Sequence, residues 1–167
     1  MHAFCGQRRI TGDILANPVK VGDKAPPFSL LSEKGETANL SDLIGQRPLV
    51  LYFYPKDNTA VCTKEASAFR DNISEFEKVE GAQIVGISSD SVDSHKQFSR
   101  DNDLPFTLLS DTGGKVRKLY GVPKFFGLLP GRVTYVIDKE GIARHIFSSQ
   151  LDYRKHIQEA LSALKSI

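Results

Sequence analysis

The stretch that decides the fold is Leu49-Val-Leu-Tyr-Phe-Tyr-Pro-Lys-Asp-Asn-Thr-Ala-Val-Cys62. Its first six residues form a continuous apolar and aromatic run between Pro48 and Pro55, which is typical of a central strand covered on both faces. The polar residues that follow favour a turn, and a helical pattern begins near the end of the stretch. Cys62 is therefore expected in the first turn of a helix, directly after a buried strand ends.

The chain beyond Cys62 continues this pattern as a strand–helix–strand unit. Phe69, Ile73 and Phe76 recur at i, i+4 and i+7, which predicts an amphipathic helix over about residues 61–79. Residues 84–87 predict a second buried strand. The segment 49–87 is thus expected to form one βαβ unit with a right-handed crossover.

The other expected elements complete one layered domain. A hairpin over 28–31 and 37–40 comes first, and the unit is followed by a helix to about residue 100, a strand over 106–109, a helix around 116–120, a loop over 123–131, a hairpin over 133–137 and 142–147 and a helix around 157–164. This order predicts an α/β, thioredoxin-like fold. A central mixed β-sheet would be flanked by helices in three layers (α/β/α), with an N-terminal hairpin.

The composition excludes several classes of protein. A length of 167 residues fits one domain, and 40% apolar residues suffice for its core without a disulfide framework, which two cysteines could not supply. A net charge of +2 does not indicate a nucleic acid or an anionic membrane as partner, and no apolar run approaches the ~20 residues of a membrane span. The four histidines lack ligand spacing, so no metal and no cofactor are expected.

Cys62 has a setting that favours the thiolate. The start of a helix stabilises a nearby anion by only ~0.3–2 kcal/mol, so a nucleophilic cysteine here requires a cation as well. Arg132 follows the turn Pro130-Gly131 at the start of a predicted strand and is the candidate, whereas Arg70 is expected to face solvent or an ion pair. The alternative is that Cys62 is a small buried apolar residue.

Two segments carry a family resemblance. Pro55-Lys-Asp-Asn-Thr-Ala-Val-Cys62 resembles the Pro-x-x-x-Thr-x-x-Cys motif of peroxiredoxins, and Gly131-Arg-Val-Thr-Tyr-Val-Ile-Asp138 resembles the segment that carries their active-site arginine. The resemblance extends from about Val21 to the end of the chain and is nearest to the peroxiredoxin Q, or bacterioferritin-comigratory, subfamily. It implies a peroxiredoxin domain over 21–167, preceded by an extension over 1–20 that is expected to be flexible.

The resemblance implies a thiol-dependent peroxidase that reduces hydrogen peroxide and organic hydroperoxides. The Cys62 thiolate would attack the O–O bond and become a sulfenic acid. The Thr59 hydroxyl and the Cys62 N–H would hold the peroxide, Arg132 would stabilise thiolate and substrate, and Pro55 would shield the sulfur. Glu65 either orients Arg132 or is an ordinary solvated acid of the first helical turn.

The chain also departs from the subfamily. Ala60 and Val61 stand where Pro and Gly are usual, and Ser67 stands where a second cysteine is expected. A serine cannot resolve the sulfenic acid, so we expect a one-cysteine cycle in which thioredoxin, glutaredoxin or a small thiol reduces Cys62. The alternative is a catalytically silent or engineered (Cys to Ser) redox binding or signalling module. A thiol–disulfide oxidoreductase is opposed by the absence of a Cys-x-x-Cys motif.

The remaining expectations concern the other cysteine, the location and the assembly. Cys5 lies in the expected extension and is interpreted as a bystander that peroxide turnover does not need. The first residues lack the apolar segment of a secretory signal, which favours a cytoplasmic location, with an organelle such as a plastid as the alternative. A monomer is expected, with a weak dimer as the alternative.

Overall fold

A computed structural model describes residues 18–127 and 129–167 of the chain. Residues 1–17 of the expected extension, Cys5 among them, lie outside the described residues. Pro18–Lys20 do belong to the described part, and there Val19 is buried and its N–H donates to the carbonyl of Tyr120 at 3.1 Å. The packed domain therefore begins before residue 21, the boundary that the sequence suggested.

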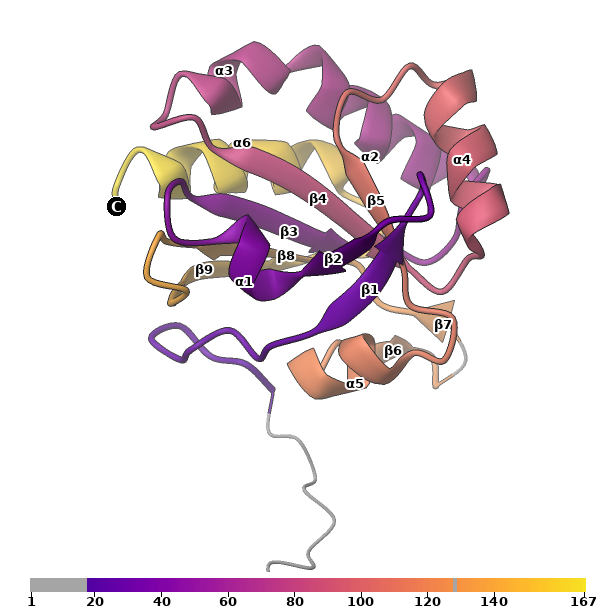
Figure 1. The fold of residues 1–167 in the computed structure, drawn as a ribbon, viewed down its shortest axis with the longest axis horizontal. Helices are drawn as coiled ribbons and strands as arrows, with labels where there is room; N and C mark the ends of the chain where they lie inside the picture. Colours follow the sequence, from indigo (N-terminus) through magenta and orange to yellow (C-terminus); the bar gives the residue numbers. More distant parts are fainter. Residues whose placement is uncertain (1–17, 128) are drawn as a thin grey trace, which may run out of the picture.

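A mixed sheet of seven strands forms the centre of the fold (Figure 1). The spatial order is β2–β1–β5–β4–β3–β8–β9, where the strands are β1 (Ser29–Ser32), β2 (Thr37–Asn39), β3 (Leu49–Phe53), β4 (Gln83–Ser88), β5 (Thr107–Ser110), β8 (Val133–Ile137) and β9 (Ala143–Ser148). Strands β3, β4 and β5 are parallel, and the other pairs are antiparallel. The parallel pairing of β3 with β4 confirms the predicted βαβ unit.

Helices cover both faces of this sheet. The helices α2 (Ala60–Asp71), α3 (Ile73–Glu77), α4 (Val92–Asp101) and α6 (Tyr153–Leu164) lie on one face, and α1 (Leu40–Leu43) and α5 (Lys115–Tyr120) lie on the other (Figure 1). Every residue of β3 is buried, and alternate side chains enter opposite cores. The three-layer, thioredoxin-like arrangement predicted from the apolar run is therefore confirmed.

Three local predictions need correction. The helix expected over 61–79 is broken at Asn72, whose side-chain amide donates to the Ala68 carbonyl at 2.8 Å and competes with the helical pattern. Leu40, expected at a strand end, instead begins α1. The segment 123–131, expected to be a loop, contains the short antiparallel strands β6 (Lys124–Phe125) and β7 (Leu129–Pro130).

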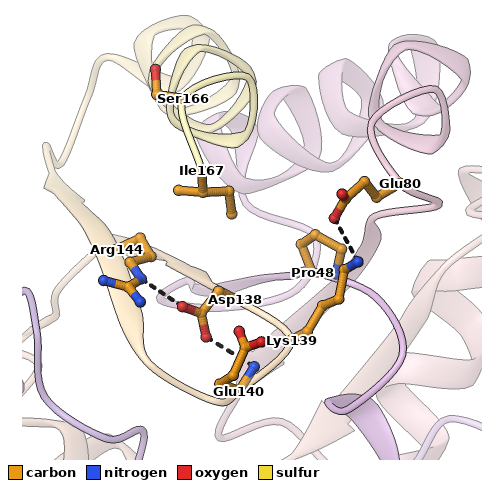
Figure 2. A pocket seen from close by; sticks show the side chains of 8 residues that line it. All are labelled: Pro48, Glu80, Asp138, Lys139, Glu140, Arg144, Ser166 and Ile167. Atoms are coloured by element: carbon orange, nitrogen blue, oxygen red, sulfur yellow. Dashed lines mark hydrogen bonds and ion pairs between the residues drawn. The ribbon is translucent and has the colours of Figure 1, made fainter.

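A hollow of about 380 Å³ lies at the end of the sheet opposite Cys62 (Figure 2). Pro48, just before β3, and Asp138, just after β8, are among its lining residues. Two ion pairs cross it, Arg144–Asp138 at 2.5 Å and Lys139–Glu80 at 3.1 Å. Four of its charged side chains form these two pairs, so we assign the hollow to the closure of the β8–β9 turn. Among the described residues, no helix is both long and apolar enough to traverse a lipid bilayer.

Candidate active site

Cys62 lies in the first turn of α2, as the sequence predicted. Thr59 is the N-cap residue, but its side chain makes no cap hydrogen bond. The Thr59 hydroxyl donates instead to the Lys56 carbonyl at 2.8 Å within the connecting loop. Cys62 is 1% exposed, and its sulfur lies near the unpaired N–H groups of the helix start, which favour a negative charge.

Arg132 reaches the same sulfur from the start of β8. Its Nη2 donates to Cys62 Sγ at 3.2 Å, and its Nε donates to the Gln150 carbonyl at 3.0 Å. The preceding Gly131 lets the chain pass close to Pro123, because a Cβ at this position would lie 2.4 Å from the Pro123 carbonyl oxygen. The strand entry therefore depends on a glycine that delivers the guanidinium to the thiol.

Glu65 holds the other side of the guanidinium. Its Oε1 accepts from Arg132 Nη1 at 2.8 Å, and the carboxyl is fully buried, so it is no solvated surface acid. Burial raises the pKa of Glu65 to about 7, against the lowering effect of Arg132. Burial opposes the charge of Arg132, but Glu65 and Cys62 outweigh it and raise the pKa of the guanidinium. The cation thus persists between two acidic groups.

The side chains of His156, Thr134 and Tyr52 lie behind Glu65, and none of them was expected from the sequence to belong to the site. His156 accepts from the Thr134 hydroxyl through Nδ1 at 2.8 Å and donates from Nε2 to the Ser149 carbonyl at 2.7 Å. Burial lowers the pKa of His156 to about 4, so its ring is neutral and its 3.9 Å approach to Glu65 Oε2 is no ion pair. The Tyr52 hydroxyl and Glu65 Oε2 are buried without a hydrogen-bond partner among the described residues.

A hollow of about 390 Å³ opens over Cys62. Its lining is mainly apolar, and it comes from the loop after β3, the start of α2, the β6–β7 segment and the turn before α6: Pro55, Lys56, Thr59, Ala60, Val61, Cys62, Phe125, Leu129, Pro130, Arg132, Gln150 and Leu151. Phe125, Leu129 and Leu151 are exposed at its rim. The sulfur is thus buried against protein but lines a hollow open to small molecules.

The structure brings four of the five predicted site residues together at this hollow. Pro55, Thr59, Cys62 and Arg132 line it, and Glu65 contacts Arg132 from behind. Ser67 lies farther along α2 and lines a separate hollow with Tyr153 and Arg154. Arg70 pairs with Asp71 at 3.0 Å and donates to the Asn102 carbonyl at 2.6 Å, as expected of a residue outside the site.

One group of metal-ligating residue types is formed only by the fold. Ligand atoms of Asp57, Asp90 and His95 lie within 4.8 Å of one another. Each is already hydrogen-bonded: Asp57 to Tyr54 and His95, Asp90 to Ser88, and both nitrogens of the His95 ring to oxygen atoms. The group therefore has the bonding of a closed polar cluster rather than of an open cation site.

Comparison with known proteins gives this geometry a context. The profile of the AhpC/TSA family matches residues 21–146. A protein called peroxiredoxin Q, chloroplastic, from Sedum lineare is 51% identical over 150 residues, covering 89% of this chain and 80% of the relative.

Solved structures of peroxiredoxins have the same fold. The peroxidoxin BcpB of Mycobacterium tuberculosis superposes with a TM-score of 0.82 at 37% identity, covering 89% of this chain and 98% of that chain. The bacterioferritin comigratory protein of Xanthomonas campestris, described for its alkyl peroxide reduction activity, has a TM-score of 0.76 at 33% identity, covering 83% and 90%. The chain belongs to the AhpC/TSA family as a peroxiredoxin of the Q, or bacterioferritin-comigratory, type, and is a thiol-dependent peroxidase.

Proposed function

We propose that Cys62 is the nucleophile that reduces the peroxide and that Thr59, Arg132 and Pro55 bind and activate the substrate around it. The observation that carries this assignment is the 3.2 Å contact between Arg132 Nη2 and Cys62 Sγ at the start of α2. A buried guanidinium and a helix N-terminus both favour the thiolate, which is the reactive form of cysteine.

The proposed reaction breaks the O–O bond of a hydroperoxide. The Cys62 thiolate attacks one oxygen, an S–O bond forms, and the other oxygen leaves with its electron pair as hydroxide or alkoxide. That product takes up one proton and becomes water or an alcohol, while the sulfur is oxidised by two electrons to a sulfenic acid. Arg132 stabilises the charge that develops on the oxygens.

Thr59 fits the binding step because of how its hydroxyl is used. The O–H donates to the Lys56 carbonyl, so a lone pair of the oxygen remains to accept the hydrogen of a hydroperoxide. The N–H of Cys62 supplies a donor on the opposite side. Pro55 lines the hollow, carries no N–H and excludes water from the sulfur.

The lining of the hollow supports organic hydroperoxides as substrates beside hydrogen peroxide. The rim of the hollow offers the apolar side chains of Phe125, Leu129 and Leu151. Contact between these side chains and the alkyl group of an organic hydroperoxide would bury apolar surface and favour its binding. We therefore assign the peroxide group to Thr59 and Arg132, and the alkyl part to this rim.

An external thiol would complete the cycle. The thiol attacks the sulfenic sulfur, releases water and forms a mixed disulfide, which a second thiol reduces to restore Cys62. Ser67 offers no thiol for an internal disulfide, and thioredoxin, glutaredoxin or a small thiol would serve. One chain supplies all the site residues, so a monomer suffices.

The comparisons bear on location as well. They lend no support to the cytoplasmic location expected from the sequence, whereas several plant relatives are named chloroplastic. We propose the plastid alternative, where a thioredoxin system could act as the reductant.

The decisive experiment follows the mass of the Cys62 peptide after one equivalent of hydrogen peroxide. Wild type and Cys5→Ser should both gain one oxygen at Cys62 and turn over peroxide with a dithiol reductant, whereas Cys62→Ser should not. Oxidation no faster than that of a free thiol would contradict the assignment and favour a silent binding module. Loss of turnover in Cys5→Ser would instead make Cys5 part of the cycle.

A further inference from the structure

The loop between β3 and α2 has one buried anchor. Of residues 55–59, Asp57 is 3% exposed, Pro55 is half-buried and the other three are exposed. Asn58 adopts a left-handed backbone (φ 61°), a region that few residues other than glycine occupy. A loop of this kind keeps its shape only when its surroundings fix it, and Pro55 and Thr59 depend on that shape to face Cys62.

Asp57 ties the loop to α4 through its side chain, and to the segment between β4 and α4 through its backbone. The carboxylate accepts from the Tyr54 hydroxyl at 2.6 Å, from the Ser94 hydroxyl at 2.8 Å and from His95 Nδ1 at 2.7 Å. The Asp57 N–H donates to Asp90 Oδ2 at 2.9 Å. The loop is therefore fastened at the point just before its left-handed residue.

His95 completes this anchor. Its Nδ1 contacts the Asp57 carboxyl at 2.7 Å, and its Nε2 lies 3.0 Å from the Leu109 carbonyl oxygen of β5. The Tyr54 hydroxyl also lies 3.4 Å from Nδ1. The side chains of His95 and Asp57 are 0% and 1% exposed, so removal of either would leave a buried polar group without its partner.

We propose that the buried Asp57–His95 hydrogen bond holds the Pro55–Thr59 loop in the geometry that binds peroxide, so that both are positioning residues for the reaction at Cys62. Neither touches the sulfur or lines its hollow. Asp57 and His95 would act by fixing the position of Thr59, whose hydroxyl must bind the peroxide while Arg132 contacts the sulfur. A shift of about 1 Å in such a group can lower a rate by about a hundredfold. This inference rests on the proposed function of Cys62.

The test separates binding of peroxide from reactivity of the sulfur. His95→Gln keeps a hydrogen-bonding side chain but removes the ring that joins Asp57 to the Leu109 carbonyl. Two rates are measured at Cys62 by peptide mass: oxidation by hydrogen peroxide and alkylation by iodoacetamide, which needs the thiolate but no peroxide-binding group. In the variant, oxidation of Cys62 should be about tenfold slower, less than the roughly hundredfold loss expected for a full displacement of about 1 Å. Alkylation of Cys62 should be less than about twofold slower.

The chain offers a matched control in His145, which pairs with Glu159 at the same 2.7 Å distance but is about one-third exposed and lies away from the hollow. His145→Gln should leave both rates unchanged. An unaltered oxidation rate in His95→Gln, or an equal fall in both rates, would overturn the proposal.

If His95→Gln does not fold by circular dichroism, Ser94→Ala provides the same test. It removes one hydrogen bond from Asp57 and should slow oxidation by about threefold while alkylation stays constant. An unchanged oxidation rate would again overturn the proposal. If the wild-type protein forms no sulfenic acid, the proposed function is refuted. If wild type is oxidised and His95→Gln is oxidised at the same rate, only this inference is refuted.

Discussion

Replacement of Glu65 by Gln should remove a pH-dependent loss of stability from the protein. Burial raises the pKa of this carboxyl from its ordinary 4.5 to about 7. Because the folded-state pKa lies above the unfolded one, the stability that the protonated group contributes is complete below about pH 4.5 and is lost as pH rises through 7. A difference of 2.5 pKa units corresponds to a loss of about 3 kcal/mol. Gln cannot ionise and avoids it.

The assay is urea unfolding at pH 5 and pH 8. Wild type should lose up to about 3 kcal/mol of unfolding free energy through this group between the two pH values, and Glu65→Gln should lose correspondingly less. Glu36→Gln, in the exposed turn between β1 and β2, controls for the removal of one negative charge. If Glu65→Gln and wild type have the same pH dependence, Glu65 is already ionised at pH 5 and the argument from burial is refuted.

The same variant should alter the reactivity of Cys62. Glu65 and Cys62 bind the two terminal nitrogens of Arg132 at 2.8 and 3.2 Å, so two anions compete for one cation. Charges roughly 7 Å apart repel by about 2 kcal/mol at an effective dielectric constant of 20. In Glu65→Gln, the pH of half-maximal Cys62 alkylation should fall by up to about 1.5 units, the equivalent of about 2 kcal/mol. A rise would indicate that Glu65 orients Arg132 in a way that the amide cannot reproduce.

Two further predictions concern the cation and the missing second cysteine. Arg132→Met should raise the pH of half-maximal Cys62 alkylation and lower kcat/KM for hydrogen peroxide by at least about a hundredfold; unchanged kinetics would remove Arg132 from the mechanism. Ser67→Cys should form a disulfide with Cys62 after one equivalent of peroxide, with a loss of helical circular dichroism, because Cα atoms five residues apart on a helix are about 8–9 Å apart, beyond disulfide reach. A disulfide formed with the helix signal intact would contradict that geometry.

The layered fold was predictable because its signals are local. The apolar run at 49–54 identifies a buried strand, and the spacing of Phe69 and Phe76 identifies the helix that follows it. The break at Asn72 was missed because apolar spacing continues across it, while the competing bond from its amide to the Ala68 carbonyl depends on the backbone turning there. Short strands such as β6 and β7 carry too few residues for any periodicity to appear.

The candidate site was predictable only in part. Thr59 and Cys62 lie on one strand–helix junction, so their proximity is local, and Arg132 was found because the sulfur required a cation. His156 lies beside Ile157 and one helical turn before Ala160, both buried, so its burial could have been read from the helix pattern. The pairing of Asp57 with His95 could not, since the partners are 38 residues apart and meet only when β3, α4 and β5 are assembled.

Strand β3 and the residue that follows it place two tyrosines near two buried polar pairs, Glu65–Arg132 and Asp57–His95. Tyr52 and Tyr54 are two residues apart, so both side chains enter the same core, with ring centroids 5.4 Å apart. Burial and then the charge of Glu65 raise the pKa of Tyr52, whereas Tyr54 donates to Asp57. Gly86 on β4 makes room for the first ring, because a Cβ there would lie 2.9 Å from the Tyr52 hydroxyl. Tyr54 therefore adds a hydrogen bond to the buried Asp57 carboxyl, whereas the Tyr52 hydroxyl is buried without a partner in the part of the chain that the structure describes. The apolar run that decides the fold thus ends in a tyrosine that also fixes the loop leading to Cys62.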